Sequence, residues 1–139
     1  VRYTGEDGEL VSVPATITTR GRSRLEICDF PPLRLDFKKK DAAGTLFAGQ
    51  KKLKLVTKCK RSSKYADYLK AEFAIYRAFN LLTDNSFRVR MLEIDYVYAA
   101  DAIYRQGEIG FFLEDKRSLA AGTDTVGVAI PTQHTLRAN

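Results

Sequence analysis

Residues 64–82, KYADYLKAEFAIYRAFNLL, are the stretch that decides the fold. At about 100° per residue, an α-helix over this range gathers apolar side chains on one stripe and leaves Lys70 and Arg77 on the other face. The stripe contains Tyr65, Leu69, Tyr76 and Phe79, with Tyr68 and Ile75 at its flanks. Glu72 lies near the middle of the stripe. The pattern therefore predicts an amphipathic helix that carries one carboxylate into the surface it should bury.

The segment before this helix begins with a predicted hairpin. Asp7-Gly8 is a turn signal, so residues 1–4 and 9–20 are expected to pair as two strands. Pro14 has no backbone N–H to donate, which favours an edge strand or a bulge in the second arm. Residues 20–32 are rich in Arg, Gly and Pro and are expected to form an irregular connection.

Two further strands are predicted between that connection and the helix. Residues 33–37, LRLDF, alternate so that the two leucines and the phenylalanine share one face. Residues 50–58, QKKLKLVTK, place their two leucines on the face opposite Lys52, Lys54 and Val56. The residues between these strands are expected to turn the chain.

Two strands are predicted after the helix. Residues 86–100 are expected to form a long strand whose apolar phase shifts between Met91 and Leu92, which predicts a bulge or burial on both faces. Residues 108–115, EIGFFLED, form the last strand. Residues 116–139 start like a short helix and then lose periodicity.

This order of elements predicts an α+β fold: a mainly antiparallel sheet of about five strands with one long helix packed on it. The chain has 139 residues, of which 45% are hydrophobic, so it is long enough for one domain with a real core. We expect residues 1–115 to form this domain and residues 116–139 to be a hinge-like helix and irregular tail.

The composition limits the function classes. The chain carries 23 Lys and Arg against 17 Asp and Glu, for a net charge of +6, which favours anionic partners. It contains no apolar run of membrane-spanning length, and its first residues do not resemble a signal peptide. Because the chain begins inside a predicted strand, we expect it to be a segment of a longer protein.

Glu72 needs a cation if it is buried, and residue 54 offers one. Lys54 points away from the leucines of its strand, toward the side where the following helix is expected to pack. A lysine on a strand paired with a glutamate on the next helix is the arrangement that protein kinases use to hold the lysine against nucleotide phosphates. Lys52 points the same way and is an alternative to Lys54. A purely structural interpretation also remains open, in which Glu72 reaches the edge of the stripe or pairs with Arg34, Arg88 or Arg90.

The connection at Arg20-Gly21-Arg22-Ser23-Arg24 is the second candidate for phosphate contact. Glycine lets a backbone approach phosphate closely, and guanidinium groups and a hydroxyl bind phosphate oxygens directly. The same residues are also compatible with a solvated basic turn or with contacts to the phosphates of RNA or DNA.

Other chemistry-bearing residues give weaker signals. Cys28 and Cys59 form neither a zinc motif nor a Cys-x-x-Cys pair, and two buried thiols or a disulfide are both open. His134 is the only histidine, no serine or cysteine has a plausible triad partner, and no carboxylates show metal-ligand spacing. Tyr and Phe follow the strand and helix periods, which is typical of core residues.

With these elements placed, the sequence resembles the N-terminal part of the CotH type of atypical protein kinases from spore coats, and more closely bacterial relatives of that family. The residues that carry the resemblance are Arg20 to Arg24, Cys28-Asp-Phe-Pro-Pro-Leu-Arg-Leu35, Lys52 to Thr57 with Cys59, the helix with Glu72 and Tyr76-Arg77, Ser86 to Arg90, and Phe111 to Asp115. They span about residues 3 to 120.

The resemblance implies a kinase-like N-lobe in which the loop at 20–24 covers ATP phosphates, Lys54 positions them and Glu72 holds Lys54. In such families the acids that bind Mg²⁺ and orient an acceptor hydroxyl lie in a C-lobe, which this chain does not include, so we expect no catalysis by the chain alone. The partners expected for the intact protein are ATP with Mg²⁺, the missing C-terminal lobe and a protein substrate. The family also implies an extracytoplasmic setting, which would favour a Cys28–Cys59 disulfide.

Two other hypotheses stay open. One is a basic module that binds nucleic acid or another polyanion through Arg20, Arg22, Arg24 and the lysine run 38–40. The other is a structural half-domain of a pseudokinase, for which Glu72→Gln would be neutral or stabilising.

Overall fold

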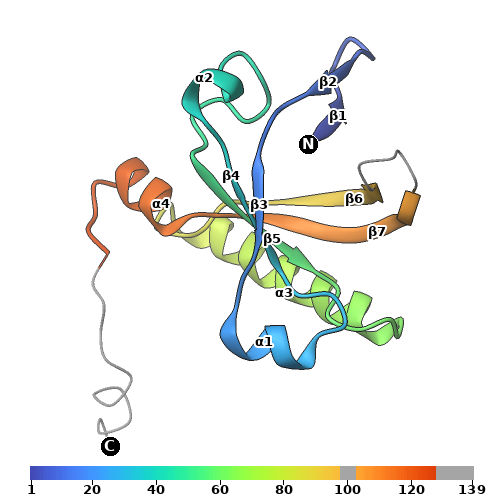
Figure 1. Cartoon of the computed structure of the whole chain (residues 1–139). Coiled ribbons are helices and arrows are strands. Elements are labelled where there is room, and N and C mark those ends of the chain that lie inside the picture. The colour runs from blue at the N-terminus through green and yellow to red at the C-terminus, as the bar shows by residue number, and fades with distance from the viewer. Residues whose placement is uncertain (98–102, 128–139) are drawn as a thin grey trace, which may run out of the picture.

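The computed structural model describes residues 1–97 and 103–127 and contains one five-stranded sheet with a long helix against it (Figure 1). The elements are β1 (Arg2–Thr4), β2 (Leu10–Ser12), β3 (Thr16–Thr19), α1 (Arg22–Ile27), β4 (Leu33–Asp36), α2 (Lys39–Ala42), β5 (Lys52–Thr57), α3 (Lys64–Leu82), β6 (Val89–Val97), β7 (Ile103–Glu114) and α4 (Lys116–Gly122). The sheet is antiparallel with the order β3-β4-β5-β7-β6, and β1 and β2 form a separate ribbon. The predicted α+β fold is confirmed.

Strand β7 is the last strand within the described residues and lies between β5 and β6, which both approach it closely. A Cβ atom added at Gly110 would lie 2.7 Å from Ile94 Cδ1 and 2.9 Å from the backbone oxygen of Val56. Glycine at this position therefore lets β7 fit between its two neighbours.

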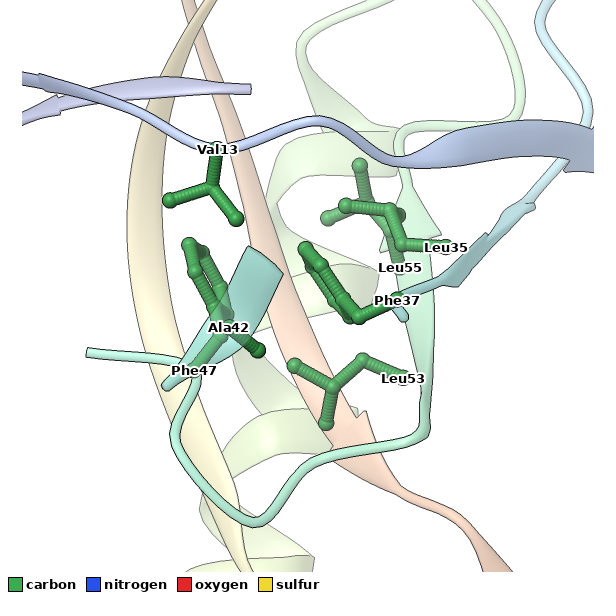
Figure 2. Packing of buried hydrophobic residues seen from close by; sticks show 7 residues of the cluster. All are labelled: Val13, Leu35, Phe37, Ala42, Phe47, Leu53 and Leu55. Atoms are coloured by element: carbon green, nitrogen blue, oxygen red, sulfur yellow. The ribbon is translucent and has the colours of Figure 1, made fainter. Parts of the chain in front are cut away.

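The sheet has an apolar core on each face. On one face, the buried cluster contains Val13, Leu35, Phe37, Ala42, Phe47, Leu53 and Leu55 (Figure 2). On the other face, α3 packs through Leu69 against Val56, Phe111 and Leu113, with Phe73 and Tyr76 at the border. The predicted alternation in residues 33–37 and 50–58 is confirmed, because the leucines of β5 enter the first cluster and Val56 enters the second.

The predicted phase shift in the strand after the helix also has a structural explanation. Val89 packs in the helix-side core, whereas Leu92 and Ile94 pack in the opposite core, so β6 is buried on both faces in succession. The irregular register lies further along, at Tyr96 and Val97. Residues 98–100 of the predicted strand lie outside the described residues.

Three details of the chain before α3 differ from expectation. The predicted second hairpin arm is two strands, because β2 ends at Ser12 and β3 joins the main sheet on the far side of Pro14. The predicted irregular connection after β3 contains α1, which begins at the N-cap Gly21. The predicted turn before β5 contains α2, whose Ala42 is buried in the first core.

Helix α3 has the predicted bounds but is rotated about its axis relative to the predicted stripe. Its side chains that face the sheet centre on Leu69, Phe73 and Tyr76, roughly 40° away from the predicted centre at about 100° per residue. Tyr68, Ile75 and Phe79, which were expected on the buried stripe, are exposed. Glu72 therefore lies at the edge of the buried face and is half-buried.

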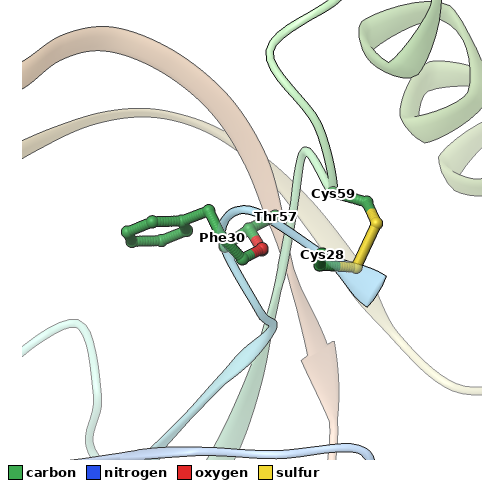
Figure 3. The surroundings of a disulfide bond; sticks show 4 residues. All are labelled: Cys28, Phe30, Thr57 and Cys59. Atoms are coloured by element: carbon green, nitrogen blue, oxygen red, sulfur yellow. A yellow bond between two sulfur atoms is a disulfide. The ribbon is translucent and has the colours of Figure 1, made fainter. Parts of the chain in front are cut away.

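Cys28 and Cys59 form a disulfide with their Cα atoms 4.6 Å apart, which resolves the alternative left open by the sequence (Figure 3). The neighbouring Phe30 reinforces this link. Its N–H donates to the Cys59 carbonyl at 3.4 Å, and its carbonyl accepts from the Thr57 hydroxyl at 3.3 Å. Its ring lies 4.6 Å from the ring of Tyr96. The segment after α1 is thus fixed to the end of β5 and to β6.

The rotation of α3 predicts different costs for the same substitution at two positions. Leu69 is 3% exposed and Leu82 is 80% exposed. Leu69→Ala should lower the free energy of unfolding by about 2–5 kcal/mol, because it removes buried methyl groups and leaves a cavity. Leu82→Ala, the matched control, should change it by less than about 0.5 kcal/mol. Urea denaturation followed by circular dichroism measures both, and equal losses would contradict the observed orientation of the helix.

Candidate functional site

Lys54 lies on the face of the sheet that carries α3, as predicted. Its neighbours across the sheet are Arg34 on β4 and Leu113 on β7. Its ammonium lies 5.0 Å from the centroid of the Phe87 ring, in the geometry of a cation–π contact. Lys54 is therefore half-buried, with its ammonium over an aromatic ring, and it takes part in none of the ion pairs between described residues.

The electrostatic surroundings of Lys54 are mainly unfavourable to its charge. Burial lowers the pKa of Lys54 from its ordinary value of 10.5, and the positive charges of Arg20 and Lys116 lower it further. The Asp115 carboxylate acts in the opposite direction. Asp115 also caps α4 by accepting a hydrogen bond from the backbone N–H of Arg117 at 3.1 Å. An anion placed near Lys54 would stabilise its charged form.

Glu72 and Lys54 do not form the direct ion pair that the kinase-like hypothesis requires. The ion pairs that join described residues involve Asp36 and Glu108 as acids, and Glu72 is in none of them. The Glu72 carboxylate instead raises the pKa of Arg20, as the Tyr76 hydroxyl also does. The negative charge of Glu72 thus acts on Arg20, without an ion pair between the two side chains among the described contacts.

Arg20 directly follows β3, and its positive charge lowers the pKa of Lys54. Its backbone N–H donates to the Pro32 carbonyl at 2.9 Å, which fixes the start of the connection. Burial lowers the pKa of Arg20 most, and the nearby charges of Arg24 and Arg34 lower it as well. Three guanidinium groups therefore share one neighbourhood.

The remaining residues of the predicted phosphate loop are arranged differently from a glycine-rich loop. Gly21 has a φ of 86°, in the left-handed region that favours glycine, and its carbonyl accepts from the Leu25 N–H at 3.0 Å. Arg22 and Ser23 lie on α1 and are exposed. Among the contacts of the described residues, none joins these two side chains to Lys54 or Glu72.

Lys52 is the partner of a different carboxylate. Its ammonium lies 3.6 Å from Asp36 Oδ1, while the Arg34 Nε atom lies 2.8 Å from Asp36 Oδ2. The side chains of Arg34 and Lys52 remain 43% and 35% exposed. Lys52 and Lys54 thus share a face, as the alternation predicts, but Lys52 and Arg34 are joined through Asp36.

Together these residues form one feature, which we call the basic cluster. It contains the cations Arg20, Arg24, Arg34, Lys52, Lys54 and Lys116, with Asp36, Glu72 and Asp115 among them. Helix α3 packs mainly on β6 and β7 and also covers Val56 near the end of β5. The strand residues of the cluster lie on the same face of the sheet, on β4 and on the Lys52–Lys54 part of β5, and the other members come from the connection after β3 and from helices α1, α3 and α4.

Some residues predicted for the site influence one another electrostatically. The pKa of Arg20 is affected by the charges of Arg24 and Glu72, and the pKa of Lys54 is affected by the charge of Arg20. The influence of Asp115 on Lys54 was missed, because two acids at the end of a strand, here Glu114 and Asp115, are usually solvated. The hydrogen-bonding position of Asp115 at the start of α4 is the signal that indicates it.

A buried hydroxyl without a partner lies beside the cluster. Thr18 on β3 is the cross-strand neighbour of Arg34. Its Oγ1 atom is buried and has no hydrogen-bond partner among the described residues. Such a group is costly to bury and marks a place where an additional acceptor or donor would be satisfied.

Other features do not form a competing site. A cavity of about 850 Å³ lies between α4 and the turn before β6, but its charged lining mixes Arg88 and Arg117 with Asp84 and Asp124. In residues 1–97 and 103–127, no group of three or more His, Cys, Asp or Glu is placed to hold a metal ion. No helix within the described ranges is long and apolar enough to cross a membrane. His134 lies outside those ranges.

The surroundings of Lys54 predict which carboxylate controls its pKa. Asp115→Asn should lower the pKa of Lys54 further, because it removes the charge that opposes burial while asparagine keeps the helix cap. Glu72→Gln should leave that pKa unchanged. Lysines labelled by reductive ¹³C-methylation and titrated by NMR report the pKa directly. A larger decrease from Glu72→Gln than from Asp115→Asn would contradict this assignment.

The same shift has a consequence for stability. The pKa of Lys54 is lower in the folded chain than its ordinary value of 10.5 in the unfolded chain. At pH values between the folded-state pKa and the unfolded-state pKa, the unfolded chain therefore binds more protons than the folded chain. The contribution of Lys54 to stability should therefore rise with pH across that window and level off above it. Lys54→Met should remove this rise in a series of denaturation curves, and an unchanged rise would assign it to other groups.

Comparisons of the chain with protein-family models, with curated proteins and with solved structures find no match. The described residues of the chain place several cations and one buried hydroxyl in the region of the carboxylates of Glu72 and Asp115.

Proposed function

We propose that this chain is the nucleotide phosphate-binding lobe of a CotH-like atypical protein kinase. The observation that carries the proposal is the basic cluster, in which Arg20, Lys54 and Glu72 converge from β3, β5 and α3. Phosphate oxygens are bound best by charged donors held in a fixed position, and arginine and lysine supply them.

The fold supports this proposal. In the five-stranded sheet, three strands precede the long helix α3 in the chain and two follow it, which is the order expected for a kinase-like N-lobe. The half of the sheet face beside α3 carries the cations, and Lys54 lies at the border between that half and the helix. A triphosphate bound there would receive charge from both the strands and the connection after β3.

The role of Glu72 differs from the kinase arrangement that suggested it. In the proposal, Arg20 and Lys54 contact phosphate, and Glu72 orients Arg20 instead of Lys54. Lys54 is held by the Phe87 ring and by the charge of Asp115. Gly21 supplies the backbone turn before Arg24, whereas Arg22 and Ser23 are exposed on α1 and make no contact with Lys54 or Glu72 among those of the described residues.

The activity of the intact protein belongs to the proposal as well. The whole protein would transfer the terminal phosphoryl group of ATP to a protein hydroxyl, with Mg²⁺ held by acids in a C-terminal lobe beyond this chain. In a pseudokinase the same lobe would bind nucleotide or serve as a structural half-domain. The Cys28–Cys59 disulfide is consistent with an extracytoplasmic setting, where disulfides persist.

The arrangement of the other basic residues favours this proposal over nucleic-acid binding. The lysine run 38–40 is exposed at α2, whose Ala42 packs in the core on the opposite face of the sheet from Lys54. The run and the basic cluster are therefore separate, whereas a nucleic-acid backbone needs a continuous basic track.

Calorimetric titration with ATP at low salt tests the proposal. Arg20→Gln and Lys54→Gln should each weaken binding by about tenfold or more, because a charged hydrogen bond contributes about 1.5–3 kcal/mol. Lys40→Gln is the matched control, since it removes the same charge from an exposed position at α2 and should change the affinity by less than about twofold.

Two results would reject the proposal. One is the absence of ATP binding by the unmodified chain. The other is an equal loss in all three variants, which would indicate binding that follows total charge, as for a nucleic acid. Circular dichroism of each variant confirms that the fold is retained.

A further inference from the structure

The part of the sheet face that α3 leaves uncovered has a regular polar pattern. Two rows of neighbouring residues cross β3, β4 and β5 on this face. The register defines them as Thr16, Asp36 and Lys52 in one row, and Thr18, Arg34 and Lys54 in the next. Every side chain in these two rows is a hydroxyl or a charged group.

The apolar side chains of this face lie elsewhere. Val56, Phe111 and Leu113 are buried beneath α3 together with Leu69. The Lys54 ammonium lies over the face of the Phe87 ring. Within the described part of the chain, the two polar rows therefore contain no apolar slot into which a flat aromatic base would fit.

This pattern decides which part of a nucleotide the face can recognise. Pockets that select a base are lined mainly by apolar and aromatic groups, with a few polar groups that fix its orientation. A phosphate chain instead needs several charged donors, which the rows and the neighbouring Arg20 supply. The charged side chains of this face can therefore bind the phosphate groups of a nucleotide, whereas the two rows contain no apolar side chain that would contact its base.

We propose that the basic cluster recognises the triphosphate group as such and does not discriminate between nucleobases. This inference depends on the proposed function and specifies its ligand class: ATP, GTP and inorganic triphosphate bind to the same residues with similar affinity.

Competition titrations test this inference with four ligands: ATP, GTP, inorganic triphosphate and adenosine. All are measured on the whole chain, without metal and in EDTA, at one ionic strength. The two nucleotides should bind within about threefold of each other, triphosphate should bind at least as tightly, and adenosine should not compete.

The outcomes separate this inference from the proposed function. If ATP binds at least tenfold more tightly than GTP and triphosphate, or if adenosine competes, the inference is wrong while the nucleotide-binding lobe stands. If no ligand binds, both are wrong. Similar affinities for the three phosphate ligands, without adenosine binding, support both.

Variants connect the ligand class to the two rows. Arg34→Gln should weaken ATP, GTP and triphosphate by the same factor, whereas Arg77→Gln, on the exposed side of α3, should change none of them. Losses confined to ATP would show contacts to the base and contradict the inference.

Discussion

Strand β5 imposes the constraint on which the rest of the structure depends, because its two faces pack into two different cores. Leu53 and Leu55 belong to the core beneath α2, and Val56 belongs to the core beneath α3. Strict alternation then forces Lys54 onto the helix side, next to apolar side chains. A slip of one residue in register would bury the lysine in the first core and expose its leucines, so the position of Lys54 is fixed by the same packing that stabilises the sheet.

The position of α3 decides how that lysine is used. The helix rests on β6 and β7, through Leu69 against Phe111, which is fully buried. It therefore leaves β3, β4 and the Lys52–Lys54 part of β5 uncovered, and Glu72 lies at the edge of the buried face of the helix. A carboxylate at this border can orient a cation without the desolvation cost of complete burial. Arg20, arriving from β3, is the cation within its influence.

The sequence was sufficient to predict the fold class, the bounds of α3 and the face of Lys54, because each depends on local periodicity. It was not sufficient to predict the rotation of α3. Two apolar stripes run along this helix, one through Leu69 and Phe73 and one through Ile75 and Phe79, and only contact with the sheet selects between them. The direct ion pair of Glu72 with Lys54 is not formed for the same reason, since a rotation of roughly 40° about the helix axis turns Glu72 toward the edge of the buried face.

Helix α1 shows why the connection after β3 also escaped prediction. It has six residues and buries none of them, so neither periodicity nor a core fixes its place. Its position comes from its ends: the Arg20 N–H bonded to Pro32 at one end, and the disulfide with the Phe30 contacts at the other. These contacts join residues far apart in sequence, which a local pattern cannot reveal. The connection that carries Arg20 and Arg24 is therefore fixed at its far end by the Cys28–Cys59 disulfide and by the contact between Phe30 and Tyr96. Burial of α1 does not contribute, because none of its residues is buried.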